Sequence, residues 1–286
     1  MMIDAHCHFQ NFQNLKYNSN DLNIQHLSHW FFFTKADSKA KDVIFNFNST
    51  EPKDWKFFEY LMDTNKQAKN VFYNFGLHPW KIGNADFDLE KALLDLEEKL
   101  QKCAKYENFG IGEIGLDFAK SIDAELQEKA FFQQLVLAAK YNRSVSIHCV
   151  RACQMLFKNL KKINRQYNQN VVFMVHSFNG SVENLDEIIK LGGYVSFSPK
   201  FSDNSNNSNN SKFQNLVLNT PNDKILLESD FDFEFEFEDF DTEFEVYFKN
   251  LEDLYAKVSS IKNMGVSDFK KLVSENFQNF INQTKN

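Results

Sequence analysis

The segment Ile3-Asp-Ala-His-Cys-His8 ends the first apolar run of the chain and contains its first candidate metal ligands. Met1-Met2-Ile3 leads into it as a predicted strand. Because successive side chains of a strand point to opposite faces, His6 and His8 project to the same side. Two imidazoles at a strand end can bind a borderline metal ion such as zinc, manganese or iron. Two surface histidines near a terminus would give the same pattern, so the remainder of the chain has to decide.

Short apolar segments recur along the sequence, and segments with helical spacing lie between them. The predicted strands are residues 2–7, 42–48, 70–77, 109–114, 144–149, 171–175, 194–198 and 224–228. The predicted helices are residues 51–69, 87–106, 123–141, 153–167, 182–191, 248–261 and 266–281. Strands that alternate with helices are typical of a parallel α/β sheet, and eight of them favour a closed (β/α)8 TIM barrel over a doubly wound sheet. We expect a single domain that spans residues 1–286.

Polar residues that can bind metal stand at the ends of several predicted strands. They are His6, His8, Glu113, His148, His176 and Asp230. A barrel brings the carboxyl ends of all its strands together, whereas an open sheet would keep its edge strands apart. Taken singly, His148 could be a core histidine, Glu113 a surface carboxylate and Asp230 a helix N-cap. Six such coincidences at strand ends are much less probable together, so we predict one site.

The residue types of this set indicate which ions it could hold. Imidazoles mixed with carboxylates suit one or two divalent ions of the zinc, manganese or iron kind, whereas oxygen ligands alone favour magnesium or calcium. A carboxylate between two ions can bridge them, and Glu113 occupies the central strand position. Two ions about 3.5–4 Å apart generate a hydroxide and stabilise a leaving oxygen. We therefore predict two divalent metal ions, with zinc, manganese, magnesium and iron all open.

Composition limits the possible partners and location. The 286 residues carry a net charge of −7, which argues against a broad basic surface for gripping nucleic acid. Hydrophobic residues make up 43% of the chain and 32 residues are Phe, so we expect Phe to fill much of the core. The four cysteines form no CxxC pair and are expected to be free thiols. With no signal pattern and no apolar run of membrane-spanning length, we expect a cytoplasmic protein without membrane contact.

Two segments fit no regular element. Residues 202–211 are rich in Asn and Ser and are predicted to form a mobile loop. Residues 231–245 alternate Phe with acidic residues, which would make a poor buried strand. We interpret them as a loop that leads into a helix, with some Phe rings packed against the core.

Several stretches together resemble the TatD family of metal-dependent deoxyribonucleases, within the amidohydrolase-like metal hydrolases. The matching stretches are Ile3–His8, Gly76–Pro79, Gly110–Asp117, Gln127–Ala138, Ile147–His148, His176–Ser181, Gly193–Ser198 and Leu226–Asp230. They follow the order of the family and cover nearly the whole predicted barrel. The GEIGLD and HSFNGS stretches are the most specific of them.

The resemblance implies a barrel with a dinuclear metal site. His6, His8 and Asp230 would hold one ion, His148 and His176 the other, and Glu113 would bridge the two. A metal-activated water would attack the phosphorus of a phosphodiester at a DNA end. Glu113 and Asp230 would be the catalytic residues, with Asp230 orienting the water or taking its proton.

The substrate would be bound by residues beside this site. The resemblance puts His78 close to the substrate. The Gly- and Ser-containing turn after His176 is a candidate phosphate-facing loop, so Ser177 and Asn179 are predicted substrate-binding residues.

The sequence departs from the family at two places that could grip a phosphodiester. The family usually has Arg two residues after the His of the fifth strand, where this chain has Val150, and Arg151 comes one residue later. The acidic run after Asp230 replaces a usual Pro and a basic stretch. Three functions therefore stay open: a hydrolase of DNA ends, a related hydrolase of a small ester, amide or phosphoester, and a metal-binding barrel without catalysis. For each we expect a monomer.

Overall fold

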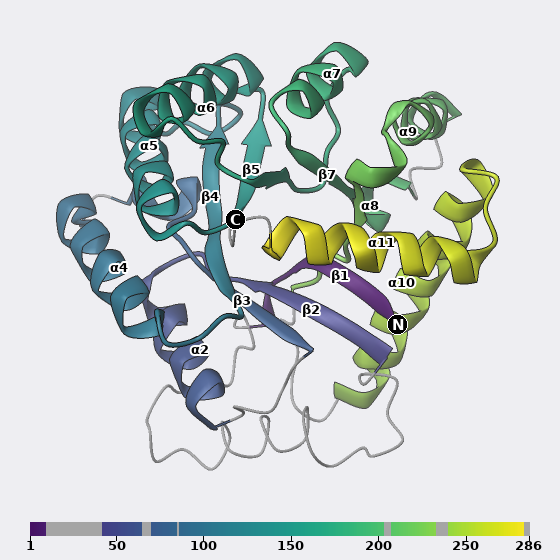
Figure 1. Cartoon of the computed structure of the whole chain (residues 1–286), viewed down its shortest axis with the longest axis horizontal. Coiled ribbons are helices and arrows are strands. Elements are labelled where there is room, and N and C mark those ends of the chain that lie inside the picture. Colours follow the sequence, from purple (N-terminus) through teal and green to yellow (C-terminus); the bar gives the residue numbers. More distant parts are fainter. Residues whose placement is uncertain (10–41, 65–69, 85, 203–206, 233–239, 283–286) are drawn as a thin grey trace.

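The computed structural model describes residues 1–9, 42–64, 70–84, 86–202, 207–232 and 240–282. Its eight strands are parallel and pair in sequence order, and helices surround them (Figure 1). The structure is a (β/α)8 TIM barrel, so the predicted fold class is confirmed.

The predicted strands all occur, with ends shifted by a few residues. They are β1 (Met2–Cys7), β2 (Val43–Asn48), β3 (Val71–Phe75), β4 (Phe109–Asp117), β5 (Val145–Val150), β6 (Phe173–Val175), β7 (Tyr194–Phe197) and β8 (Ile225–Leu227). The described helices are α2 (Pro52–Thr64), α3 (Pro79–Ile82), α4 (Leu89–Cys103), α5 (Ala124–Tyr141), α6 (Cys153–Tyr167), α7 (Val182–Lys190), α8 (Pro199–Ser202), α9 (Asn207–Asn219), α10 (Phe240–Ile261) and α11 (Val266–Asn282).

Polar side chains fix where several of these helices begin. The carboxylate of Asp123 accepts a hydrogen bond of 2.7 Å from the backbone N–H of Leu126 at the start of α5. Asp88 and Ser181 cap α4 and α7 in the same way. Each cap satisfies a backbone donor that the first helical turn leaves unpaired. The strand-to-helix connections are thereby held at defined residues.

The strands are buried on both faces, as expected for a parallel sheet covered by helices. On β2, Phe45 and Phe47 face the outer layer, where the ring of Phe47 lies 6.2 Å from that of Phe58 in α2. Asn46 lies between them on β2 and accepts a hydrogen bond of 2.6 Å from the side-chain amide of Asn74 on β3. Many of the largest fully buried side chains are Phe, which confirms the predicted Phe-rich core.

The barrel closes between β1 and the segment that follows β8. The backbone N–H of Asp230 donates to the carbonyl of His6 at 3.0 Å, and that of His8 donates to the carbonyl of Phe231 at 3.0 Å. A parallel bridge joins His8 to Asp232. The first and last candidate ligands in the sequence are therefore neighbours across this seam.

Helix α11 covers the amino-terminal end of the barrel and crosses it in the foreground of Figure 1. Phe277 packs against Phe72 near the start of β3, and Phe280 packs against Tyr194 at the start of β7. The side-chain amide of Asn276 donates to the carbonyl of Ile225 at 2.9 Å. With this end covered, the carboxyl ends of the strands are left to build a site.

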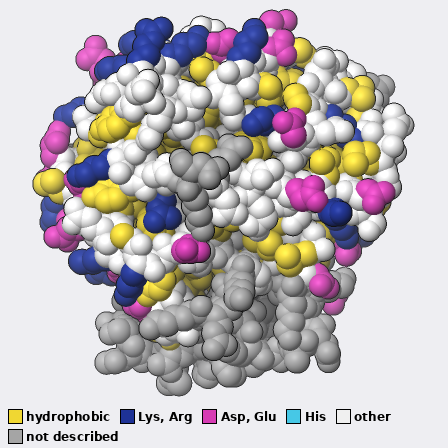
Figure 2. All heavy atoms as spheres, viewed as in Figure 1, with side chains coloured by type: hydrophobic (Ala, Val, Ile, Leu, Met, Phe, Trp, Pro, Cys, Tyr) yellow, Lys and Arg dark blue, Asp and Glu magenta, His cyan; other side chains and the backbone are white. Residues whose placement is uncertain are grey.

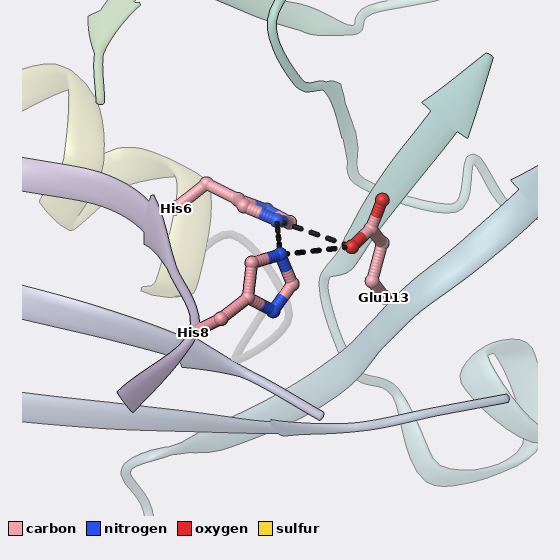
Figure 3. A group of neighbouring side chains, drawn as sticks. All are labelled: His6, His8 and Glu113. Carbon is pink, nitrogen blue, oxygen red and sulfur yellow. Dashed lines mark hydrogen bonds and ion pairs between the residues drawn. The ribbon is translucent and has the colours of Figure 1, made fainter. Parts of the chain in front are cut away.

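Strand β1 contains an irregularity that redirects its side chains. Asp4 pairs with Phe45 and Cys7 pairs with Phe47, so three steps along β1 match two steps along β2. Asp4 and Cys7 both face the outer layer as a result, and His6 and His8 point inward (Figure 3). Strict alternation would have placed Asp4 beside the two imidazoles.

The two irregular segments are described in part. Residues 207–211, predicted to belong to a mobile loop, begin α9 instead, and residues 203–206 lie outside the described residues. Residues 233–239 of the acidic segment also lie outside them. The described remainder agrees with the interpretation in part. The segment leads into a helix, and Phe244 is buried while the ring of Phe231 packs 5.6 Å from that of Tyr247. Helix α10 begins at Phe240, however, eight residues before its predicted start at residue 248, so residues 240–245 are helical and not loop.

In the part of the chain that the structure describes, no helix combines the length and hydrophobicity needed to cross a membrane. The cytoplasmic location stays a prediction.

Candidate metal centre

Glu113 on β4 lies at the middle of the candidate site, with imidazoles on both sides of its carboxylate. Its Oε2 atom lies 3.3 Å from His6 Nε2 and 3.3 Å from His8 Nε2, and the two Nε2 atoms are 3.1 Å apart (Figure 3). All three side chains are buried. One carboxylate oxygen and two ring nitrogens thus converge on one small region at the strand ends.

The other carboxylate oxygen of Glu113 faces a second group. Its Oε1 atom lies 2.8 Å from His176 Nε2, 2.9 Å from His148 Nδ1 and 3.2 Å from His78 Nε2. His148 Nδ1 and His176 Nε2 are 3.2 Å apart. The described structure therefore brings five histidines from four strand ends around one carboxylate.

The remaining ring nitrogens are held by second partners, and these partners set the tautomers. His8 Nδ1 lies 3.0 Å from the carbonyl oxygen of Asn48, which can only accept a hydrogen bond. A neutral His8 therefore carries its proton on Nδ1 and directs the lone pair of Nε2 toward Glu113. His6 Nδ1 lies 2.9 Å from the hydroxyl of Ser146, which can accept its proton in the same way. Such outer partners are typical of metal-binding imidazoles.

Two further carboxylates orient the second group, and the sequence analysis singled out neither of them. Asp117 Oδ2 lies 3.3 Å from His148 Nε2, and Glu228 Oε1 lies 3.3 Å from His176 Nδ1. Glu228 also accepts a hydrogen bond from the hydroxyl of Ser196. Asp117 ends the GEIGLD stretch, and Glu228 lies two residues before Asp230. These positions, close to predicted ligands, were the only signal in the sequence that pointed to the two carboxylates.

Burial and mutual interactions shift the pKa values of the cluster in opposite directions. Burial, together with neighbouring His176, lowers the pKa of His6 to about 3. Burial also opposes charge on His8, but Glu113 and Asp230 raise the pKa of this imidazole to about 9. Burial opposes ionisation of Glu113 as well, yet the surrounding imidazoles hold its pKa well below its usual range. The centre is thus an ionised carboxylate among imidazoles that cannot all be protonated.

Asp230 lies at the edge of this cluster, just beyond β8. Its Oδ1 atom is 3.9 Å from His8 Nε2, and its Oδ2 atom is 3.1 Å from the ammonium of Lys200. Burial opposes its ionisation, but His176 and His6 lower its pKa. Its backbone has a φ of 49°, in the left-handed region. The carboxylate is therefore shared between the imidazoles and a lysine from α8.

Asp4 fixes the chain segment that carries Asp230. The carboxylate of Asp4 accepts hydrogen bonds from the N–H of Ser229 at 2.8 Å, from its hydroxyl at 2.6 Å, and from the hydroxyl of Tyr247 at 2.8 Å. Burial raises the pKa of Asp4 to about 6, although these hydrogen bonds oppose the shift. The irregularity in β1 places Asp4 where it can do this.

Gly115 explains part of the GEIGLD stretch. Its φ is 153°, and a Cβ at this position would lie 1.9 Å from the carbonyl oxygen of His148. The backbones of β4 and β5 can therefore approach closely only if this residue has no side chain. The same approach sets the position of His148 relative to Glu113.

The predicted substrate residues occupy different surroundings. His78 caps α3, with its Nδ1 accepting from the N–H of Trp80, and its Nε2 joins the cluster. Ser177 is hydrogen-bonded to Ser198 at 2.8 Å, and Asn179 accepts two hydrogen bonds from Lys212. His78 thus contacts the candidate ligands directly, whereas Ser177 contacts the segment that follows β7 and Asn179 contacts helix α9.

The donor set fits divalent ions that accept both nitrogen and oxygen ligands. Buried imidazole nitrogens lie next to an ionised carboxylate, and several of their other nitrogens are held by oxygen acceptors. Zinc, manganese and iron are the ions that such mixed sets favour.

Comparison with known proteins places the chain in a family of metal-dependent hydrolases. Residues 3–282 match a family model described as TatD related DNase. An uncharacterised metal-dependent hydrolase of Buchnera aphidicola is 24% identical over 232 residues, which cover 80% of each chain. A 3'-5' ssDNA/RNA exonuclease TatD of Edwardsiella piscicida is 30% identical over 156 residues, which cover 54% of this chain and 55% of that protein.

Solved structures share the fold. A TatD homologue from Escherichia coli has a TM-score of 0.71 at 19% identity, with 98% of this chain and 97% of that chain covered. A TatD-family hydrolase from Entamoeba histolytica has a TM-score of 0.66 at 17% identity, with 98% and 97% covered. At these identities, the likeness concerns the (β/α)8 fold.

Proposed function

This chain belongs to the TatD-related DNase family of metal-dependent hydrolases, and on that premise we propose that it hydrolyses phosphodiester bonds at DNA ends. The observation that carries the proposal is the position of Glu113 between two groups of imidazoles. Its Oε2 faces His6 and His8, and its Oε1 faces His148 and His176. A carboxylate with each oxygen facing its own pair of nitrogens can bridge two ions.

The proposed ligand set is the one that the family resemblance implies, and the distances around Glu113 support it. One ion would be held by His6, His8 and Asp230, the other by His148 and His176, and Glu113 would belong to both. Bound ions would supply an activated water and positive charge opposite the oxygens of the phosphate. Zinc, manganese, magnesium and iron are the candidate ions.

The protein's own groups orient the reaction and move its proton. Asp230 is ionised at neutral pH because nearby imidazoles lower its pKa, so its carboxylate can accept the proton that an attacking water loses. Asp117 and Glu228 fix the ring orientations of His148 and His176 by accepting from their outer nitrogens.

Further assignments belong to the same proposal. His78 contacts the cluster from β3 and would lie beside the substrate. Ser177 and Asn179, in the loop after His176, would face its phosphates. The whole chain, residues 1–286, would work as one domain and as a monomer.

A small phosphoester is the alternative substrate, and two features favour it. Val150, which is half-buried, stands where the resemblance implies Arg, and acidic residues follow Asp230 where it implies a basic stretch. Both changes remove positive charge that would hold a polyanion.

A substrate panel tests the proposal. Protein loaded in turn with zinc, manganese, magnesium or iron is given single-stranded DNA, duplex DNA, RNA, bis(p-nitrophenyl) phosphate and a carboxylic ester. Turnover of DNA ends that is lost in Glu113→Gln supports the proposal. Turnover of the small diester alone supports the alternative. Full metal loading without turnover of any substrate would contradict both and indicate a binding barrel.

A further inference from the structure

Trp80 is a large aromatic side chain that remains exposed beside the candidate metal centre. It is 46% exposed, whereas Trp55 is buried in the core. The other exposed large hydrophobic side chains among the described residues are aliphatic: Met1, Leu94, Leu218, Val246 and Val266. Trp80 lies in the first turn of α3, two residues after its N-cap His78 and close to the carboxyl end of β3. An exposed indole therefore lies at the rim of the site.

The indole is held in one orientation by the site itself. Its Nε1 donates a hydrogen bond of 2.6 Å to Asp117, the carboxylate that orients His148. The centroid of the Trp80 ring lies 5.0 Å from that of His78 at 88°, and 5.8 Å from that of His148 at 76°. The ring is thus fixed one side chain away from the candidate ligands, so binding a ligand there would cost little ordering entropy.

A cation lies over the face of this ring. The ammonium of Lys120, an exposed residue, is 4.4 Å from the ring centroid. Because Lys120 and Trp80 are both exposed, this face of the ring borders solvent, and a base that stacks on it would take the place of the ammonium. An aromatic face next to a positive charge is the combination with which proteins bind single-stranded nucleic acid, by stacking a base and neutralising its phosphate.

We propose that Trp80 is a stacking platform for the terminal nucleobase of a single strand, and that Lys120 pairs with the adjoining phosphate. The inference rests on the proposed hydrolysis of DNA ends and adds how the end is recognised. Stacking is tolerant of base identity, because every base has a π face. The platform would therefore place any terminal nucleotide next to Glu113 without selecting a sequence. It would also supply affinity that the negatively charged chain cannot obtain from a basic surface.

The competing explanation is that Trp80 only supports Asp117. Trp80→Phe separates the two roles, because Phe keeps an aromatic face but loses the Nε1–H donor. Trp80→Leu keeps apolar bulk and loses both. If Trp80 acts only on Asp117, Phe and Leu should behave alike.

The test measures binding by fluorescence anisotropy on the metal-loaded protein. One probe is a labelled oligothymidylate with phosphorothioate linkages that slow its hydrolysis, and the other carries abasic residues at both ends. We expect wild type to bind the base-bearing probe about 5- to 150-fold more tightly, which corresponds to roughly 1–3 kcal/mol of stacking. Trp80→Leu should abolish this preference, Trp80→Phe should keep most of it, and Lys120→Gln should weaken both probes alike. Leu218→Ala, another exposed position, should bind as wild type does.

Several outcomes would overturn the inference. They are equal binding of both probes by wild type, an unchanged preference in Trp80→Leu, or no binding of either probe. The proposed hydrolysis can fail separately. If DNA is not cleaved in the substrate panel but the base preference depends on Trp80, the platform stands and the reaction assignment falls. Circular dichroism of each variant shows whether it is folded, and Trp80→Phe and Trp80→Leu provide two independent readings.

Discussion

Glu113 is the residue whose loss should affect the candidate centre most, because both of its carboxylate oxygens face imidazoles. Glu113→Gln keeps the shape of the side chain and removes the charge that balances these imidazoles. We expect the purified variant to carry less than half of the metal of wild type, measured by elemental analysis. Glu125→Gln, at an exposed position of α5, is the matched control. Metal content equal to wild type in Glu113→Gln would exclude a bridging role.

Asp230 is expected to matter for proton transfer from the attacking water and not for the stability of the fold. Asp230→Asn keeps the backbone contact with His6 but removes a base, and general acid–base catalysis typically contributes about 10²–10⁴-fold. We expect kcat to fall by about that factor, while the urea midpoint changes little. The exposed Asp253→Asn serves as control. Undiminished turnover in a fully metal-loaded Asp230→Asn protein would remove this residue from the chemistry.

At the scale of elements, strand ends were the predictable part of the site. The six predicted ligands stand at the ends of apolar runs that form the parallel strands of the barrel, and the structure brings all six to one end of it. They are His6, His8, Glu113, His148, His176 and Asp230. Asp117 and Glu228 could not be predicted in this way, because they act through the outer nitrogens of other side chains.

Three local features also escaped sequence reasoning. The irregularity of β1 turns Asp4 outward, and alternation alone cannot reveal it. Helix α9 begins within an Asn- and Ser-rich segment whose low helix propensity predicted a loop. There, packing overrides propensity, because Phe213 and Val217 are buried farther along the helix. Arg151 follows the end of β5 with a φ of 55°, so strand alternation does not determine where it points.

The contact between β4 and β5 gives a prediction about a whole element. Gly115→Ala would place a Cβ against the His148 carbonyl in a backbone conformation that side chains rarely adopt. Strain of this kind together with a backbone clash should cost more than about 3 kcal/mol of unfolding free energy. Urea denaturation measures this cost, and metal content should fall with it because His148 is displaced.

Gly265→Ala is the control for this substitution, because its nearest neighbouring atom would be 3.6 Å from the new Cβ. We expect it to change stability by less than about 1 kcal/mol. If Gly115→Ala is equally mild, the close approach of the two strands does not hold the site together.

At the scale of the whole molecule, charge sets how nucleic acid can be bound. Acidic and basic side chains are interspersed on the face drawn in Figure 2, and no histidine is visible among its coloured residues. The net charge of −7 leaves binding to a few local cations, of which Lys200 at Asp230 and Lys120 at Trp80 lie beside the site. Affinity for DNA should therefore depend on the mouth of the barrel rather than on a broad surface.

A shallow salt dependence follows from this count of cations. Neutralising two phosphates of a single strand gives a slope of log K against log[salt] of about −1.4, so affinity should fall on the order of sevenfold between 50 and 200 mM salt. A protein that makes six to ten phosphate contacts would lose about 10³–10⁵-fold over the same range. Anisotropy titrations with the single-stranded probe measure the slope, and Lys200→Gln should reduce it further. A slope several times steeper would mean that other lysines line the path of the strand.

The acidic residues from Asp232 to Glu245 should oppose binding through their field. Replacing them with Asn and Gln should raise affinity for single-stranded DNA and leave cleavage of bis(p-nitrophenyl) phosphate unchanged, since a small diester need not pass along them. The gain should be largest at low salt, where the screening length is about 30 Å at 0.01 M against about 8 Å at physiological ionic strength.

The control is the double variant Asp95→Asn with Glu98→Gln, at two exposed positions of α4. It shows how a less negative net charge affects DNA binding when the changed residues lie away from the site. If that control raises affinity as much as the acidic-segment variant, net charge rather than the position of the acidic run limits binding. Efficient cleavage of long duplex DNA by wild type would show that the acidic run does not act on the substrate.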